Sequence, residues 1–321
     1  MFKMWANIQA VILLLITSML MGAVSAIDNT SGKSCVDSTF LTSVYTNDLI
    51  WGRPKIGSDI DLTSLIFDFN RQDFMTTFNP VAGVQNNTRH DFNIAYTYYR
   101  YWDSGYQPGN YSFVDFAVTK GYSVLFYDRV GAGQSTVISG YDSQFSIHVD
   151  VLQDIIGPAK GGYITPQTRM SPKYVPKKVV LMGHSVGSIA TNALVAAQPD
   201  IADGIVLSGF YKVPNLDKRA VKYVFDSSWP IAIMEFFSIA TSNFASPGVK
   251  APVLFINGEY DYIFCGGYCP GSLEPAARSF LPASIGYESY IQPNTGHILN
   301  TAPNTTGTYQ AITNFLAKNG L

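Results

Sequence analysis

The chain has 321 residues, 47% of them hydrophobic, which is enough to bury a sizeable core within one domain. Its formal net charge is −2, its pI is about 6.1 and only 14% of its residues are charged. The composition therefore provides no basic surface for a nucleic-acid backbone, and we expect no nucleic-acid partner.

The first 26 residues have the pattern of a leader peptide. Lys3 precedes a mostly apolar run over residues 10–21, and small residues follow at 23–26. We predict a signal peptide over 1–26 that is cleaved after Ala26, and a secreted, extracellular protein. The alternative is a membrane anchor, but the apolar run is shorter than the roughly 20 residues that a spanning helix needs. A stable membrane anchor is therefore not expected.

Two further features agree with an extracellular route. The sequence contains four acceptor motifs for N-glycosylation, at Asn29, Asn86, Asn110 and Asn304. It also contains three cysteines, of which Cys265 and Cys269 are close enough to bridge one loop in an oxidising compartment, while Cys35 remains without an assigned partner. The alternative is that all three are buried small apolar side chains. No histidine has a spacing to them that would form a metal site, so we predict no metal and no cofactor.

A clear secondary-structure pattern begins after about Tyr111, where short apolar runs alternate with amphipathic stretches. This alternation is typical of βα units around a parallel sheet, and no repeat or linker indicates a second domain over 27–321. Strands are predicted at 123–127, 179–182, 205–207, 253–256 and 287–291, and helices at 188–197 and 308–316. A glycine-rich turn follows the first of these strands.

Between residues 211 and 248 the alternation breaks, and aromatic residues and prolines accumulate. We interpret this stretch as a short lid inserted over the site. The alternative is a pair of ordinary surface helices whose aromatic side chains pack on the core.

The segment Gly183-His184-Ser185-Val186-Gly187 matches the pattern G-x-S-x-G. A serine at the apex of a strained strand-to-helix turn leaves no room for side chains two positions away, and therefore requires Gly183 and Gly187. A β-prone run precedes the motif and a helical run follows it, which is the context that the motif needs. We predict that Ser185 is a nucleophile.

A serine nucleophile requires a base, and the base requires an orienting carboxylate. The sequence has four histidines, at His90, His148, His184 and His297. His184 is inside the elbow and is expected to point away from Ser185, His148 is in a predicted helix, and His90 is in the poorly patterned N-terminal part. His297 follows the last predicted strand, at the carboxyl edge of the sheet where such sites collect. We predict that it is the base.

The carboxylate should follow a strand end between the serine and the histidine. Asp261 does so, just after the strand that ends near residue 256, with Glu259 as the nearby competitor. Asp203 precedes a strand and is therefore expected at the opposite edge of the sheet.

Together, the turn over 128–135, the elbow over 183–187 and the loops at 258–261 and 296–297 resemble the α/β-hydrolase superfamily, of the AB hydrolase-1 type found among secreted fungal enzymes. The resemblance covers about residues 111–321. It implies an α/β-hydrolase fold with a mostly parallel sheet and helices on both faces, and a triad of Ser185, Asp261 and His297. It also implies that the backbone N–H of Val186 is one oxyanion donor and that the charges of the 128–135 turn pair locally.

The N-terminal strands depart from the pattern of the superfamily. Its members usually carry a third strand ending in His-Gly, whose loop supplies the second oxyanion donor, and no such pair occurs here. Either an altered loop, such as residues 95–102, supplies this donor, or the fold is divergent or incomplete.

The motifs lead us to expect a serine hydrolase that acts on a small-molecule ester, esterase- or lipase-like, without a cofactor. Peptide cleavage is a related possibility on the same fold. Epoxide opening and dehalogenation are disfavoured, because they usually employ an aspartate nucleophile. The alternative from another class is a non-catalytic binding protein that keeps the fold but lacks a complete oxyanion hole. The sequence does not indicate an oligomeric state.

Overall fold

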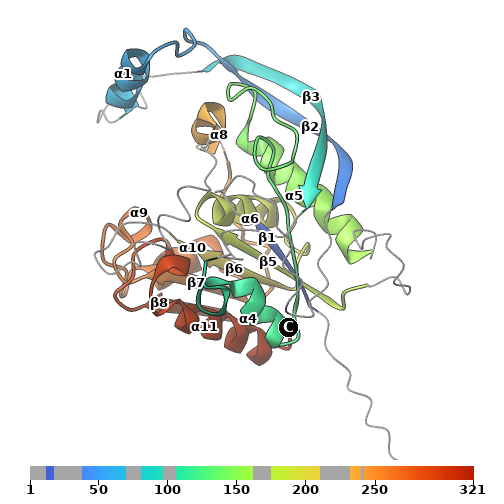
Figure 1. Ribbon diagram of the computed structural model, residues 1–321, viewed down its shortest axis with the longest axis vertical. Helices are drawn as coiled ribbons and strands as arrows, with labels where there is room; N and C mark the ends of the chain where they lie inside the picture. The colour runs from blue at the N-terminus through green and yellow to red at the C-terminus, as the bar shows by residue number, and fades with distance from the viewer. Residues whose placement is uncertain are drawn as a thin grey trace, which may run out of the picture.

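The computed structural model of the chain describes residues 12–17, 38–69, 81–96, 106–161, 175–209, 232–239 and 242–321. A six-stranded sheet lies at the centre of the molecule, with the strand order β4-β1-β5-β6-β7-β8 and parallel pairing throughout (Figure 1). Its strands are β1 (Ile12–Thr17), β4 (Ser123–Phe126), β5 (Lys178–His184), β6 (Gly204–Ser208), β7 (Val253–Gly258) and β8 (Tyr287–Gln292).

Helices cover both faces of this sheet. The helices α5 (Phe145–Lys160) and α6 (Val186–Ala197) pack on one face, and α4 (Phe113–Thr119) and α11 (Thr305–Lys318) pack on the other. In β5, Val179 and Leu181 join the core under α5 and α6, whereas Val180 and Met182 join the core under α4 and α11. Both faces of the strand are buried, which explains why its sequence is a continuous apolar run instead of an alternating one.

The shorter elements lie around this framework. The helix α3 (Pro108–Tyr111) leads into α4, α8 (Ile233–Ser238) packs near α5, and α9 (Tyr262–Cys265) and α10 (Leu273–Phe280) separate β7 from β8. A 3-10 turn, η2 (Leu299–Thr301), precedes α11. No helix in the described part of the chain is long and apolar enough to cross a membrane.

The predicted fold class is confirmed. Each strand and helix predicted from residue 123 onward lies inside an observed element, except that Tyr127 follows the end of β4. The alternation of buried strands and helices could therefore be read directly from the sequence in this half of the chain.

The N-terminal half differs from the expectation. The strand β1 lies between β4 and β5, with Leu13 opposite Ser123 on one side and opposite Val179 on the other. Its residues belong to the apolar run that we predicted to be part of a cleaved leader. A chain cleaved after Ala26 would lose this strand, so leader removal and the six-stranded sheet exclude one another in the same molecule.

A long antiparallel hairpin, β2 (Ser38–Trp51) and β3 (Val81–Tyr96), forms a separate two-stranded sheet. It lies over α5 and carries α1 (Asp59–Phe69) near its far end (Figure 1). Its last residues bond to the turn after β4, where Asp128 N–H donates to Ala95 O at 2.8 Å and Thr136 N–H donates to Asn93 O at 2.9 Å.

The turn after β4 is tied to α8 by a buried ion pair. Arg129 Nη1 lies 2.5 Å from Glu235 Oε2, and both side chains are buried. The expectation that the charges of this turn pair locally is therefore wrong for Arg129, although the Asp128 carboxylate does accept the N–H of Gln134 at 2.8 Å. Much of the predicted lid (211–248) falls outside the described residues, which include only 232–239 and 242–248 of it.

Candidate active site

Ser185 lies between the end of β5 and the start of α6, with φ 55° and ψ −125°. A non-glycine residue rarely adopts this conformation, which costs about 1–3 kcal/mol and is typical of functional sites. A Cβ at Gly183 would lie 2.3 Å from Gly187 O and 2.6 Å from Ser188 Cα. The turn therefore requires glycine at position 183, for the steric reason expected from the sequence.

Hydrogen bonds fix the backbone of Ser185 on both sides. Its N–H donates to Ser208 O at 2.8 Å, and its carbonyl accepts the Ser188 hydroxyl at 2.6 Å. The neighbouring strand and the first turn of α6 thus hold the serine in position.

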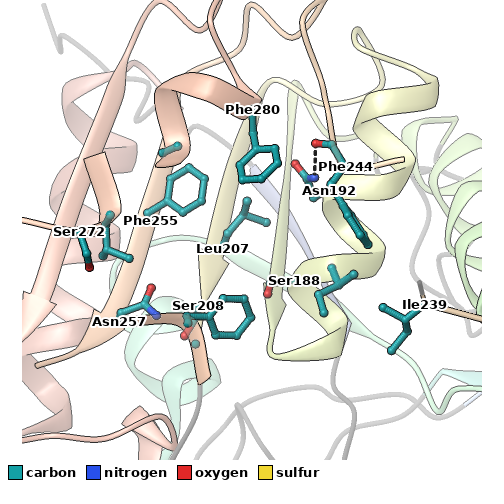
Figure 2. Close-up of a pocket in the computed structure, with 15 residues that line it drawn as sticks. Ser188, Asn192, Leu207, Ser208, Ile239, Phe244, Phe255, Asn257, Ser272 and Phe280 are labelled. Carbon is teal, nitrogen blue, oxygen red and sulfur yellow. Dashed lines mark hydrogen bonds between the residues drawn. The ribbon is translucent and has the colours of Figure 1, made fainter. Parts of the chain in front are cut away.

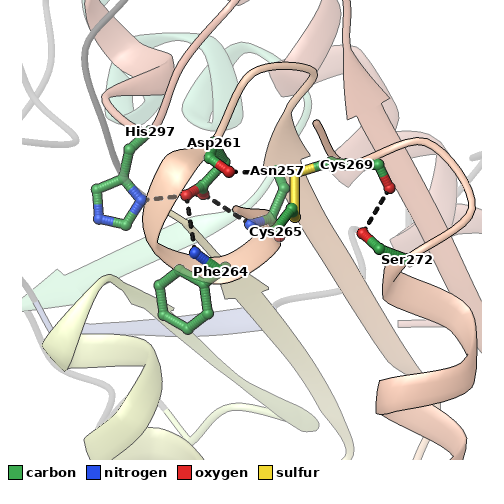
Figure 3. The surroundings of a disulfide bond; sticks show 7 residues. All are labelled: Asn257, Asp261, Phe264, Cys265, Cys269, Ser272 and His297. Carbon is green, nitrogen blue, oxygen red and sulfur yellow. Dashed lines mark hydrogen bonds and ion pairs between the residues drawn. A yellow bond between two sulfur atoms is a disulfide. The ribbon is translucent and has the colours of Figure 1, made fainter. Parts of the chain in front are cut away.

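Asp261 follows β7 and has no exposed surface. Its Oδ2 accepts Asn257 Nδ2 at 2.8 Å and lies 3.1 Å from His297 Nδ1, while its Oδ1 accepts the Phe264 N–H at 3.1 Å (Figure 3). A buried carboxylate is tolerated when several donors satisfy it in this way.

His297 lies in the loop after β8 and is fully buried. Burial, and secondarily the neighbouring His184, lower the pKa of its imidazole far below the ordinary value. The ring is therefore neutral at neutral pH. Because its Nδ1 is bonded to Asp261, Nε2 is the nitrogen that can act as a base.

His184 brings the elbow and the histidine loop together. Its ring centroid lies 4.9 Å from that of His297, and its Nδ1 lies 3.1 Å from Ser208 Oγ. Sequence reasoning predicted only that this side chain points away from Ser185 and missed its contact with the His297 ring. A G-H-S motif carries no signal for that contact, because it depends on how two loops meet in space.

The competing residues lie elsewhere. Glu259 accepts the Asn294 N–H at 2.8 Å, and Asp203 pairs with Lys178 at the opposite end of β5. His90 on β3 lies 2.8 Å from Asp48, and His148 on α5 lies 3.3 Å from the Ser143 hydroxyl. Among the residues considered as base or acid, the structure joins Asp261 to His297.

Val186 is the first residue of α6. Its N–H is among the helix amides that have no acceptor within the helix, at the positive end of the helix dipole, which suits a developing oxyanion. The described residues do not identify a second donor. Within 95–102, only Ala95 and Tyr96 are described, and the Ala95 N–H donates to Ser135 Oγ at 2.9 Å. In β1, Thr17 pairs with Gly183, and the residues after it are not described.

Cys265 and Cys269 form a disulfide that closes the loop after Asp261 (Figure 3). Within this loop Asp261 O accepts the Gly267 N–H at 3.0 Å, and the Cys269 N–H donates to Glu259 O at 2.8 Å. The bridge thus braces the segment that carries the carboxylate. Cys35 and Asn29 lie outside the described residues.

The other predicted glycosylation residues, Asn86, Asn110 and Asn304, are all exposed. No group of His, Cys, Asp or Glu in the described residues could hold a metal ion.

A cavity of about 370 Å³ lies beside these residues, between α6, β6, β7 and α10 (Figure 2). We call it the chamber. Its size is within the range of small-molecule sites. The described residues that line it include four phenylalanines, Phe244, Phe255, Phe264 and Phe280, and none of these described residues is charged.

Comparison with known proteins agrees with this architecture. The sequence pattern of the family described as serine aminopeptidase, S33, matches residues 111–243. The solved structure of a thermophilic esterase from Thermogutta terrifontis superposes with a TM-score of 0.52 at 16% identity, and the match covers 71% of this chain and 94% of that one. The chain has the α/β-hydrolase fold.

Two other solved structures are similar at lower scores. Est1E from Butyrivibrio proteoclasticus, with ferulic acid bound, gives a TM-score of 0.44 at 14% identity and covers 64% of this chain and 81% of its own. A monoacylglycerol lipase from Paleococcus ferrophilus gives a TM-score of 0.45 at 16% identity, and the match covers 64% of this chain and 88% of the lipase. No curated protein matches the chain in sequence.

Proposed function

We propose that this α/β-hydrolase-fold chain is a serine hydrolase that cleaves carboxylic esters through an acyl-enzyme on Ser185. The observation that carries the proposal is the strained Ser185 at the strand-to-helix turn, together with the fully buried Asp261–His297 pair, whose imidazole contacts the ring of the adjacent elbow residue His184. A serine hydroxyl needs such a base, and the base needs such a carboxylate, to react at neutral pH.

In the first step, His297 Nε2 accepts the hydroxyl proton while Ser185 Oγ bonds to the ester carbonyl carbon. Asp261 fixes the tautomer through its 3.1 Å contact with Nδ1 and stabilises the imidazolium that forms. The Val186 N–H stabilises the oxyanion. The proton then passes from His297 to the leaving alcohol, and water activated by the same ring hydrolyses the acyl-enzyme.

A second candidate activity is removal of an N-terminal amino acid, because the matched family is described as serine aminopeptidases. An aminopeptidase has to hold a substrate ammonium group, for which a carboxylate is the natural partner. Within the described part of the chain, no charged side chain lines the chamber, and the Asp261 carboxylate is already engaged by three donors. These observations favour an ester over a peptide amine.

The test is turnover of p-nitrophenyl esters and of amino-acid p-nitroanilides by the wild type, Ser185→Ala and His297→Ala. We expect ester turnover in the wild type and a loss of about a thousandfold or more in both variants, because triad residues act as a unit. Faster turnover of the anilides would support the aminopeptidase. If folded wild-type protein turns over neither class of substrate, the alternative of a non-catalytic binding protein is favoured.

We further propose that the protein passes through the secretory route. The exposed acceptor asparagines and the Cys265–Cys269 bridge are consistent with an oxidising compartment. Mass spectrometry of the extracellular protein before and after glycosidase treatment tests this, and we expect glycan on at least one of Asn86, Asn110 and Asn304. The N-terminal residue found in the same experiment decides whether residues 1–26 are removed or retained with β1.

A further inference from the structure

The chamber lies beside the proposed triad, and several of its lining residues contact Ser185, Asp261 or His297. Two of its lining residues bond the backbone of the nucleophile, because Ser208 O accepts the Ser185 N–H and the Ser188 hydroxyl donates to Ser185 O. Asn257, another lining residue, donates to Asp261. The ring of Phe264 lines the chamber and also stacks on His297, with centroids 5.6 Å apart and an interplanar angle of 23°.

Each polar side chain among the described lining residues is engaged with the protein itself. Asn192 Nδ2 donates to Phe244 O at 2.8 Å, and the Ser272 hydroxyl donates to Cys269 O at 2.7 Å. Ser208 Oγ lies 3.1 Å from His184 Nδ1, and Ser188 and Asn257 make the bonds given above. A ligand in the chamber therefore meets hydrocarbon surface, and a ligand with polar groups would lose their hydration without new partners.

The chamber is also elongated. It runs along β6 and β7 from Ser208 and Asn257, near the triad, toward Phe244 and Phe280 at the other end (Figure 2). Phe280 at this outer end is 42% exposed and Phe264, which stacks on His297, is 45% exposed, so lining side chains reach the surface at both ends of the chamber.

We propose that the chamber binds the acyl chain of the ester, and that this chain is an aliphatic hydrocarbon without polar substituents. The inference rests on the proposed function. Phe264 forms the wall between the catalytic base and the bound chain, so that the carbonyl lies at Ser185 while the methylenes extend along β6 and β7.

The experiment is a series of p-nitrophenyl esters from acetate to dodecanoate, with kcat/KM measured for each. Burying one methylene should raise kcat/KM about fourfold until the chamber is full. Ala277→Phe fills the chamber from α10 at a position that is only 2% exposed in the wild type. This variant should lower kcat/KM for decanoate by about tenfold to a hundredfold more than it lowers kcat/KM for acetate, because acetate has no methylenes to place in the chamber.

Ala317→Phe is the matched control, because Ala317 is an exposed residue of α11, which packs on the opposite face of the sheet. If Ala277→Phe does not fold, Leu273→Trp, at a half-buried lining position of the same helix, replaces it. A chain-length series that is flat in the wild type, or that responds equally to Ala277→Phe and Ala317→Phe, would overturn the assignment.

Binding by Ser185→Ala protein separates this inference from the proposed function. We expect 1-decanol to displace the dye 8-anilinonaphthalene-1-sulfonate from this protein, and the displacement to be lost when Ala277→Phe is added. If 1-decanol displaces the dye in this way but neither the wild type nor any variant cleaves esters, the proposed function fails and the chamber assignment stands. If esters are cleaved without dependence on chain length, the chamber assignment fails and the proposed function stands.

Discussion

At Asp261, a carboxylate with no exposed surface accepts hydrogen bonds from Asn257, from the Phe264 N–H and from His297. Asn257 is the one amide side chain in this set, and it shares Oδ2 with the histidine. Space for this contact exists because residue 209 is glycine, since a Cβ there would lie 2.3 Å from both Asn257 Nδ2 and Asp261 Oδ2. Asn257 is therefore a positioning residue for the proposed triad.

Asn257→Leu should lower kcat for ester hydrolysis by about tenfold to a hundredfold with little change in KM, because a buried carboxylate loses one donor. Steady-state kinetics on p-nitrophenyl acetate measure this. Asn314→Leu, at an exposed position on α11, serves as the control. Equal rates in the two variants would show that Asn257 does not position Asp261.

The residues of the candidate triad could be selected from the sequence, because their order and their positions after strand ends follow from the G-x-S-x-G context. Asn257, Gly209 and His184 could not be assigned in this way. Their roles depend on distances between strand ends and loops that are far apart in the chain, and none of the three belongs to a local pattern that indicates its role.

At the scale of the elements, the junction of β5 and α6 requires the backbone of Gly183 to lie close to the backbone of Gly187 and Ser188. Gly183→Ala should destabilise the fold by about 3 kcal/mol or more, because the new Cβ would overlap the backbone of Gly187 and Ser188. Gly157→Ala on α5 is the control, since a Cβ added there would meet no atom within 4 Å and a helical glycine-to-alanine change stabilises by about 0.5–1 kcal/mol. Urea unfolding measures both, and similar free energies would contradict the steric account.

The strand β2 could not be recognised because its burial and its hydrophobicity coincide at only some of its positions. In β2, Thr42 and Thr46 are buried at 5% and 4% exposure, whereas Leu41 and Tyr45 are 71% and 56% exposed. The Thr42 hydroxyl donates to the Asp154 carboxylate on α5, which compensates its burial. An alternating strand whose inward positions include both threonine and valine, as Val44 does between Thr42 and Thr46, does not show the usual apolar pattern.

The strand β1 was missed for a different reason. A short apolar run has the same composition whether it is the core of a leader or a strand buried in a parallel sheet. The structure predicts that a chain beginning at Ile27, which lacks β1, melts roughly 10 °C or more below the full chain, because β4 and β5 lose the strand between them. Circular dichroism compares the two, and equal melting temperatures would show that the sheet does not need β1.

Across the whole molecule, three buried histidines couple stability to pH. Burial lowers the pKa of His148, of His184 and of His297, so each is neutral in the folded protein. In the unfolded chain they titrate near about pH 6.5. Below that pH the unfolded state binds protons that the folded state does not, and stability falls by up to about 1.4 kcal/mol per pH unit for each histidine.

The carboxylate of Asp150 has the opposite effect on the pH dependence of stability. Burial, together with Asp154, raises the pKa of Asp150 to about 6. As the pH falls, this carboxylate is therefore protonated in the folded state before it is protonated in the unfolded chain. The net prediction is a loss of unfolding free energy between pH 7 and pH 5, measured with urea at several pH values. His184→Phe should reduce the pH dependence of the unfolding free energy by the contribution of about one bound proton. A stability that stays constant or increases over this range would contradict the assignment of neutral buried histidines.

The central claim is that Ser185 is the activated nucleophile, and the most direct measurement is the site of fluorophosphonate labelling by mass spectrometry. We expect a single modified residue, Ser185, in the wild-type protein and no modification in Ser185→Ala or in His297→Ala at the same probe concentration. Labelling that persists in folded Ser185→Ala, or a folded wild-type protein that resists the probe, would contradict it.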